Sequence, residues 1–239
     1  MRATFSSIHL LTNWRTRLVH FLLLPVLNLA LLVAVNNQFS GSFSWNVAAA
    51  SVLMSGAMMT VNALCISFTT DRNLGIDREV VARAPFSWYY WGCKCLTAAL
   101  LGSLVIAVNL ALLALAGRAQ VPWRLALSLA PQMIFSGLAV GFVACVGAWS
   151  LRDPYFWNNL LTVFSNVVSG ALVLLSAYPP WLRVIGKAFP FASTLSCLHG
   201  AAASRGYDFL LALAWLLLGC LLYGGQVRRL RAQARSSAL

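Results

Sequence analysis

The amino-acid sequence predicts an all-α integral membrane protein with about six transmembrane helices. Of the 239 residues, 60% are hydrophobic and 9% are charged, whereas a soluble domain carries roughly 25% charged residues. A helix of about 20 apolar residues crosses the roughly 30 Å hydrocarbon core of a bilayer. Six runs of about that size lie between the charged residues, at 18–35, 45–68, 95–116, 125–149, 160–177 and 209–224.

A transmembrane β-barrel is the alternative fold for so apolar a chain, and the sequence argues against it. The strands of a barrel alternate apolar and polar residues over about ten positions. The run WLLLGCLLYGG at 215–225 is apolar without such alternation. Because the six spans leave little chain over, residues 1–239 are expected to form a single transmembrane domain.

The first 17 residues are expected to form an interfacial helix on the cytoplasmic surface. Apolar residues recur there at helical spacing, at Phe5, Ile8, Leu11 and Trp14. An amphipathic helix of this kind lies in the headgroup region of a bilayer. The run at 18–35 is too long for the apolar core of a signal peptide, so it is expected to remain as the first span.

The Lys and Arg residues are distributed unevenly over the connections between the spans. If the N-terminus is cytoplasmic, twelve of the 17 basic residues lie in cytoplasmic segments, and cytoplasmic loops of membrane proteins are enriched in Lys and Arg. We therefore expect a multi-pass protein of the cytoplasmic (inner or plasma) membrane with both termini in the cytoplasm. The basic tail at 226–239 is expected to contact membrane lipids. The net charge of +12 thus indicates lipid contact rather than nucleic acid.

The stretch 69–91, TTDRNLGIDREVVARAPFSWYYW, holds three of the five carboxylates of the chain. A short helix is predicted from Ile76 to Ala84, because Pro85 ends it and two acidic residues stand at its start, where the helix dipole favours negative charge. The aromatic residues that follow are typical of a membrane interface. This helix is therefore expected at the cytoplasmic surface, between spans two and three.

Two faces are predicted for this short helix. Its apolar residues are expected to lie together on one side: Ile76, Val80, Val81 and Ala84. Glu79 and Arg83 are four residues apart, so their side chains can pair on the exposed side.

The long connection at 178–208 is expected to form a re-entrant external element before the last span. It is largely apolar, and its prolines divide it into a predicted helix at Trp181–Phe189, a stop at Pro190 and a second helix at Phe191–Ala203. Irregular backbone at membrane depth is tolerated where protein buries it or water reaches it. The element is therefore a candidate external gate.

Polar residues within the spans are candidates for a substrate path or a subunit interface, because they are costly to expose to lipid. They include Asn62, Asn109, Ser165, Asn166 and Ser169; the last three are predicted to form the contact between subunits. The spans contain no acidic residue, which argues against a proton-driven carrier.

A G-x-x-x-G step in the fourth span, Gly137 and Gly141, allows another helix to approach closely. Packing within the chain is the favoured interpretation of this step, and contact between subunits is the alternative.

An integral-membrane enzyme is a competing interpretation. Asp71, Asp77 and Glu79 could form a metal-dependent phosphotransfer site, but they do not share one helical register. The three histidines lie far apart in the chain, and Cys93 and Cys95 have no partners that would complete a metal site. We therefore predict no metal site and no catalytic residues on this chain.

Together these features resemble the permease subunits of type 2 ATP-binding-cassette (ABC) transporters, the ABC-2 exporter family, over nearly the whole chain. Two segments carry the resemblance. They are DREVVARAPFSWYYWGCK at 77–94 and YPPWLRVIGKAFPFAST at 178–194.

The resemblance implies a role for each segment. The first, with the residue that precedes it, would supply an ATPase-coupling helix with the residues Ile76, Asp77, Arg78, Glu79, Val80 and Arg83. The second would supply the external gate with the residues Pro180, Trp181, Phe189 and Pro190.

The resemblance also implies partners. A second permease subunit, either a copy of this chain or a related paralogue, would face the first, and each would bind a cytoplasmic ABC ATPase. The chain lacks the phosphate-binding run G-x-x-x-x-G-K-[ST], so ATP and Mg are expected on the partner ATPase and no cofactor on this chain.

The function implied is export of an amphipathic or hydrophobic substrate, such as a drug or antibiotic, a lipid or a peptide, as in multidrug efflux. The alternative is a non-transporting membrane immunity or sensor partner with the same fold; an enzyme fits less well.

Overall fold

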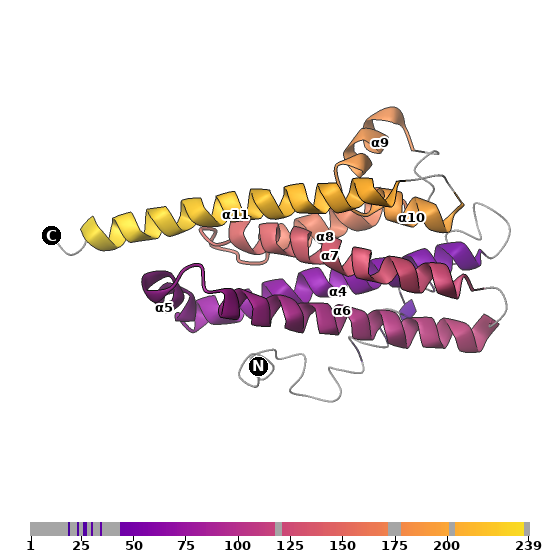
Figure 1. Ribbon diagram of the computed structural model, residues 1–239, viewed down its shortest axis with the longest axis horizontal. Coiled ribbons are helices and arrows are strands. Elements are labelled where there is room, and N and C mark those ends of the chain that lie inside the picture. Colours follow the sequence, from indigo (N-terminus) through magenta and orange to yellow (C-terminus); the bar gives the residue numbers. More distant parts are fainter. Residues whose placement is uncertain are drawn as a thin grey trace.

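The computed structural model describes residues 44–117, 121–171, 178–200 and 204–236, together with isolated positions between 19 and 34 (Figure 1). The expected interfacial helix at 1–17 lies outside the described residues, as does almost all of the first predicted span at 18–35. All regular structure in the described part is helical, which agrees with the predicted all-α class.

Four long helices form the body of the molecule (Figure 1), and each is long and apolar enough to cross a membrane by length and composition. They are α4 (Trp45–Asn73), α6 (Trp88–Gly117), α7 (Trp123–Gly147) and α11 (Arg205–Ser236). They contain the greater part of the predicted spans at 45–68, 95–116, 125–149 and 209–224. The basic tail, expected from residue 226, continues α11 as helix as far as Ser236.

Helix α4 is the centre of the bundle. It packs along both α6 and α7, while α11 packs along α7. In the apolar part of α4, 83% of the residues are buried, against 22% in α11. One side of α11 is therefore uncovered in a single chain.

Glycines allow α4 to approach its neighbours closely. A Cβ added at Gly137 of α7 would lie 2.6 Å from the Ala57 carbonyl oxygen, and one at Gly141 would lie 3.1 Å from the Val61 Cα. The G-x-x-x-G step therefore packs within the chain, as the favoured interpretation predicted.

The fifth predicted span differs from the structure in its boundaries. Helix α8 (Phe156–Val168) has 13 residues, which is about 20 Å of helix and less than the roughly 30 Å of a bilayer core. It ends before Gly170, whose φ of 78° is the left-handed conformation typical of a helix stop. A continuous helix over 160–177 is therefore wrong; residues 172–177 lie outside the described part.

Three short helices lie where the sequence predicted them. They are α5 (Ile76–Arg83), α9 (Pro180–Lys187) and α10 (Ala192–Leu198). The α5 helix lies at one end of the bundle, beside the C-terminal part of α11, and α9 and α10 lie at the other end (Figure 1).

The α10 helix is attached to α11 by Asp208. The Asp208 carboxylate accepts hydrogen bonds from the Thr194 backbone N–H at 2.6 Å and from the Thr194 hydroxyl at 2.8 Å. A carboxylate in this position satisfies a free N–H group of the first helical turn and interacts favourably with the helix dipole.

Candidate functional site

The α5 end of the bundle carries most of the charged side chains in the described part, and we treat it as the candidate site. The chain leaves α4 through Gly75, which has a φ of 73°; glycine adopts this left-handed conformation without a steric penalty. This sharp turn directs α5 across the end of the bundle rather than along it.

One face of α5 is buried, but it is not the predicted face. Asp77 and Val81 are buried, Val80 is half-buried, and Ile76 and Ala84 are exposed. The prediction that Ile76 and Ala84 belong to the buried side was wrong. The reason is that the Asp77 carboxylate has a partner inside the bundle, which rotates the acidic residue inward.

Three hydrogen bonds hold the α5 segment to α7 and α11. The Trp149 indole N–H, just after α7, donates to Asp77 Oδ2 at 3.0 Å. The Tyr223 hydroxyl on α11 donates to the Pro85 carbonyl oxygen. The Arg231 guanidinium, also on α11, lies 3.4 Å from the Val81 carbonyl oxygen that it donates to. The segment is therefore fixed at its start, its middle and its end.

An aromatic cluster underlies these anchors. The Trp91 ring lies 5.8 Å from Phe68, 5.0 Å from Phe142 and 5.1 Å from Tyr223, between ring centroids. Trp149 stacks on Tyr223 at 5.4 Å and meets Phe68 edge-on at 5.2 Å. Aromatic pairs add about 0.5–1.5 kcal/mol each beyond their buried area, so the cluster ties together α4, α6, α7 and α11.

A buried ion pair joins α4 to α6 in the same region. Lys94 Nζ lies 2.9 Å from Asp71 Oδ2 and donates to the Ser67 carbonyl oxygen at 2.8 Å. The Tyr90 hydroxyl donates to the same Asp71 oxygen at 2.7 Å. Lys94 is only 2% exposed. A buried charge persists only where a partner of opposite charge compensates its lost hydration, and Asp71 supplies that here.

The opposite side of α5 is exposed and charged. Arg83 and Glu79 pair at 3.0 Å, with side chains 81% and 61% exposed, and Arg78 is also exposed. An exposed pair of this kind contributes at most about 1 kcal/mol, so little energy is lost when a partner surface rearranges it. Of the three carboxylates in the stretch 69–91, only that of Glu79 is available to a partner protein. Asp71 and Asp77 are buried and bind Lys94 and Trp149 of the same chain.

The residues predicted for a substrate path or interface do not all come together. The Asn158 amide on α8 donates to Asn62 Oδ1 on α4 at 2.8 Å, whereas the Asn109 amide donates to the Val105 carbonyl oxygen of its own helix. Ser165 and Ser169 are buried, and Asn166 is exposed.

Ser165, Asn166 and Ser169 were predicted to form one contact between subunits, and within a single chain only Asn166 of the three is exposed. Ser165 lies on the buried side of α8, seven residues after Asn158. Residues spaced in this way lie on the same face of a helix, so Ser165 belongs to the side that faces α4. Asn166 alone of the three points away from the bundle.

The predicted gate residues also divide into two groups. Pro180 and Trp181 are exposed, with Trp181 at 64%. Phe189 and Pro190 are buried, and the Phe189 ring lies 5.5 Å from Trp215 of α11 and 6.3 Å from Phe164 of α8. The second pair therefore anchors the α9–α10 segment, and the first pair is free to meet solvent, lipid or another protein.

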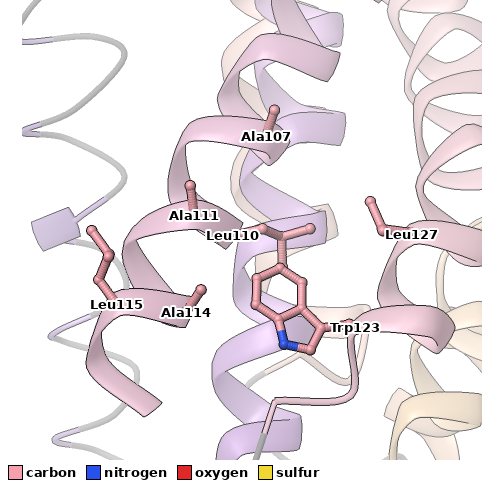
Figure 2. A pocket seen from close by; sticks show the side chains of 7 residues that line it. All are labelled: Ala107, Leu110, Ala111, Ala114, Leu115, Trp123 and Leu127. Atoms are coloured by element: carbon pink, nitrogen blue, oxygen red, sulfur yellow. The ribbon is translucent and has the colours of Figure 1, made fainter. Parts of the chain in front are cut away.

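An apolar hollow of about 740 Å³ lies between the C-terminal end of α6 and the start of α7, with Trp123 standing between the two helices (Figure 2). Its lining is Ala107, Leu110, Ala111, Ala114, Leu115, Trp123 and Leu127. Such a lining suits an apolar chain or ring rather than a charged ligand.

Sequence reasoning missed two parts of the site. Lys94 was counted among the cytoplasmic charges, although it is buried, and Tyr223 was read as part of an ordinary span. The only signal for the ion pair was that Asp71 and Lys94 each lie within a few residues of one of two neighbouring apolar runs. No His, Cys, Asp or Glu triplet that could hold a metal occurs within the described residues.

The site thus combines a rigidly held helix, a charged outer face and a buried ionic contact at one end of the bundle. Comparison with known proteins assigns no family to this arrangement: no family model, no curated protein and no solved structure matches the chain.

Proposed function

We propose that the chain is the transmembrane permease subunit of an ATP-driven exporter of the type 2 ABC class. It would move an amphipathic or hydrophobic substrate, such as a drug, a lipid or a peptide, out across the cytoplasmic membrane. The α5 end would face the cytoplasm with both termini, and the α9–α10 end would face outward.

The observation that carries the proposal is the two-sided construction of α5. Its inner side is bonded to α7 and α11 through Trp149, Tyr223 and Arg231, and its outer side is charged and exposed. A helix that transmits force from a partner needs both properties. A helix that merely connects two spans needs neither the buried hydrogen bonds nor the charged outer face.

The proposed mechanism is alternating access. ATP and Mg bound to the partner ATPase supply the energy, and closure of the ATPases displaces α5. Because Asp77 and Pro85 are hydrogen-bonded to Trp149, just after α7, and to Tyr223 on α11, the displacement pulls on these two helices. The aromatic cluster and the Lys94–Asp71 pair carry the movement to α6 and α4, which tilts the spans.

A second permease subunit, a copy or a related paralogue, would cover surface that one chain leaves open. Helix α11 is only 22% buried in its apolar part, and the outer side of α8, which includes Asn166, is exposed. The apolar hollow at Trp123 supports a hydrophobic rather than a charged substrate.

Replacement of Arg78, Glu79 and Arg83 together by alanine tests the proposal. These side chains are exposed, so the spans should still fold, while transport should uncouple from ATP hydrolysis. The measurements are ATPase activity with and without substrate, and export in vesicles, on the chain co-purified with its ATPase. The control is Arg228→Ala with Arg229→Ala, two exposed positions on α11.

Unchanged substrate-stimulated hydrolysis and export in the triple variant would rule out the coupling role of α5. A chain that co-purifies with no ATPase and moves nothing in vesicles would instead favour a non-transporting immunity or sensor protein.

A further inference from the structure

Two buried cysteines meet in the contact between α4 and α7. The Cys145 thiol donates a hydrogen bond to the Cys65 sulfur at 3.2 Å, and the Cys65 thiol donates to the Gly141 carbonyl oxygen at 3.7 Å. The two cysteines are 80 positions apart in the chain, and neither forms a disulfide bond. The packing of the two helices is therefore what brings their sulfur atoms together.

This contact continues the close packing that glycine allows between the two helices. Gly141 and Cys145 are four residues apart on α7, as are Val61 and Cys65 on α4, so each pair lies on one face of its helix. A Cβ added at Gly141 would lie 3.1 Å from the Val61 Cα. One turn further along, the same close approach places the two sulfur atoms against each other.

The distance between the sulfur atoms favours a covalent bond over a metal site. A disulfide bond is about 2.05 Å long, so the separation of 3.2 Å has to shorten by only about 1.2 Å. A metal ion bound to both thiolates, with metal–sulfur bonds of about 2.3 Å, would instead push the two sulfur atoms further apart. The pair is thus closer to the geometry of a disulfide.

Burial decides which reagents can act on this pair. Cys65 is 2% exposed and Cys145 is 3% exposed, and both belong to the apolar core. Burial shields a cysteine from bulky and charged reagents, whereas hydrogen peroxide is small and uncharged. Peroxide has to reach only one of the sulfur atoms, during a brief separation of α4 and α7, because the second sulfur is already in contact with the first.

We propose that Cys65 and Cys145 form a redox modification site, at which a small uncharged peroxide creates a disulfide bond between α4 and α7. One thiol attacks the O–O bond of hydrogen peroxide, becomes a sulfenic acid and releases water. The other thiol attacks the sulfenic sulfur, so that the S–S bond forms, the S–O bond breaks and a second water leaves. Two thiols and one peroxide thus give one disulfide and two waters, with sulfur oxidised and peroxide reduced.

The disulfide would fasten the central helix of the bundle to its neighbour. Because it joins positions 80 residues apart, it restricts the unfolded chain and stabilises the folded one. We expect the oxidised protein to unfold at a temperature about 5 °C higher, or more. The bond would also oppose the tilting of the spans, a consequence that rests on the proposed transport function.

Peroxide treatment of the purified full chain in lipid vesicles tests the linkage. The treated protein is denatured, its remaining thiols are blocked with a maleimide, and its peptides are mapped by mass spectrometry. We expect a peptide that joins Cys65 to Cys145. The exposed Cys220 reports that peroxide has acted. Oxidation of Cys220 without the joined peptide, or a link from Cys145 to Cys95 instead, would overturn the proposal.

Variants assign the change in stability to the pair. Cys65→Ala should abolish the rise in unfolding temperature that peroxide produces. The matched control is Cys93→Ala with Cys95→Ala, two half-buried positions on α6, which should keep the joined peptide and the full rise. If Cys65→Ala does not fold, the control still decides, since loss of the rise there would assign the effect to Cys93 and Cys95.

Reduction of the treated protein measures how well the pair is shielded. Dithiothreitol, which is small and uncharged, should restore both thiols in the folded protein. Glutathione, a charged tripeptide, should do so about tenfold more slowly, because thiol–disulfide exchange requires direct access to a sulfur atom. Equal rates would contradict a site selective for small uncharged reagents. No ATPase takes part in these measurements, so their outcome is independent of the proposed transport function.

Discussion

At the scale of single residues, the Lys94–Asp71 pair is the most consequential contact in the described part. Both charges are buried, and the pair joins α4 to α6, two of the long helices of the bundle. Two further groups, the Ser67 carbonyl and the Tyr90 hydroxyl, complete its hydrogen bonding. Such a pair adds little net stability when intact, but loss of one partner leaves an uncompensated charge.

We therefore predict that Lys94→Met destabilises the protein by about 3–5 kcal/mol, because Asp71 is left buried and unpaired. The double variant Lys94→Met with Asp71→Leu should recover most of the loss. Thermal unfolding in detergent measures both. The control is Arg83→Met, which removes an exposed pair and should cost about 1 kcal/mol or less. A similar loss in Lys94→Met and Arg83→Met would contradict the buried role.

A second residue-scale prediction concerns His199 at the end of α10, outside the four long helices. Burial lowers the pKa of His199 below its usual value, since its Nε2 is enclosed without a hydrogen-bond partner in the described part. The unfolded chain then takes up the proton more readily than the folded one. Stability from this group is present above the ordinary histidine pKa of about 6.5 and is lost as pH falls through the lowered pKa.

Unfolding temperatures between pH 8 and pH 5 test this expectation. The wild-type protein should lose stability on acidification, and His199→Gln should lose less, because glutamine does not titrate. Equal pH dependence of the two proteins would show that His199 is not the group responsible.

At the scale of elements, close helix packing around α4 depends on glycine. A Cβ at Gly102 of α6 would lie 2.0 Å from Thr60 Oγ1 and 2.8 Å from the Gly56 carbonyl oxygen. The second atom belongs to the backbone, so α6 must move away from α4 to make room. Gly92, on the same helix, has nothing within 4 Å of an added Cβ.

Gly102→Ala is therefore expected to destabilise the bundle by about 1–3 kcal/mol, the usual cost of overpacking. Gly92→Ala should be neutral or stabilising by up to about 1 kcal/mol, because alanine favours helix. Thermal unfolding of the two variants compares them directly. If Gly102→Ala is as stable as Gly92→Ala, the two helices do not approach as closely as the structure indicates.

At the scale of the whole molecule, the two ends of the bundle differ in kind. One end has α5, the ion pair and the basic part of α11, and the other has α9 and α10 (Figure 1). The excess of basic residues on one side predicts that the α5 end is cytoplasmic. The large uncovered surface of α11 predicts contact with lipid or a second subunit.

Labelling with a membrane-impermeant maleimide tests the orientation. Arg78→Cys should react in inverted vesicles but not in intact cells, and Trp181→Cys should react in intact cells. Both positions are exposed, so neither is protected by packing, and labelling of the wild-type cysteines gives the background. The opposite pattern would reverse the orientation and with it the proposed direction of transport.

The positions of most described helices could be predicted from the sequence, whereas the side of each helix that is buried could not. The runs at 45–68 and 125–149 and the short helix before Pro85 were recognisable because apolar periodicity and proline act locally. The rotation of α5 was missed because its cause, the Trp149 indole, is 72 residues from Asp77. The end of α8 was missed because the apolar character of the chain continues past Gly170, where the backbone turns.

That this protein is helical and apolar enough for a membrane follows from its amino-acid order, because hydrophobic length and charge spacing are properties of the chain alone. Which charges are available to a partner protein depends on how the helices pack. Lys94, Asp71 and Asp77 look like surface charges in the sequence, yet each is buried against a group from another helix. Burial and pairing depend on contacts between distant segments, and these exist only once the helices have packed.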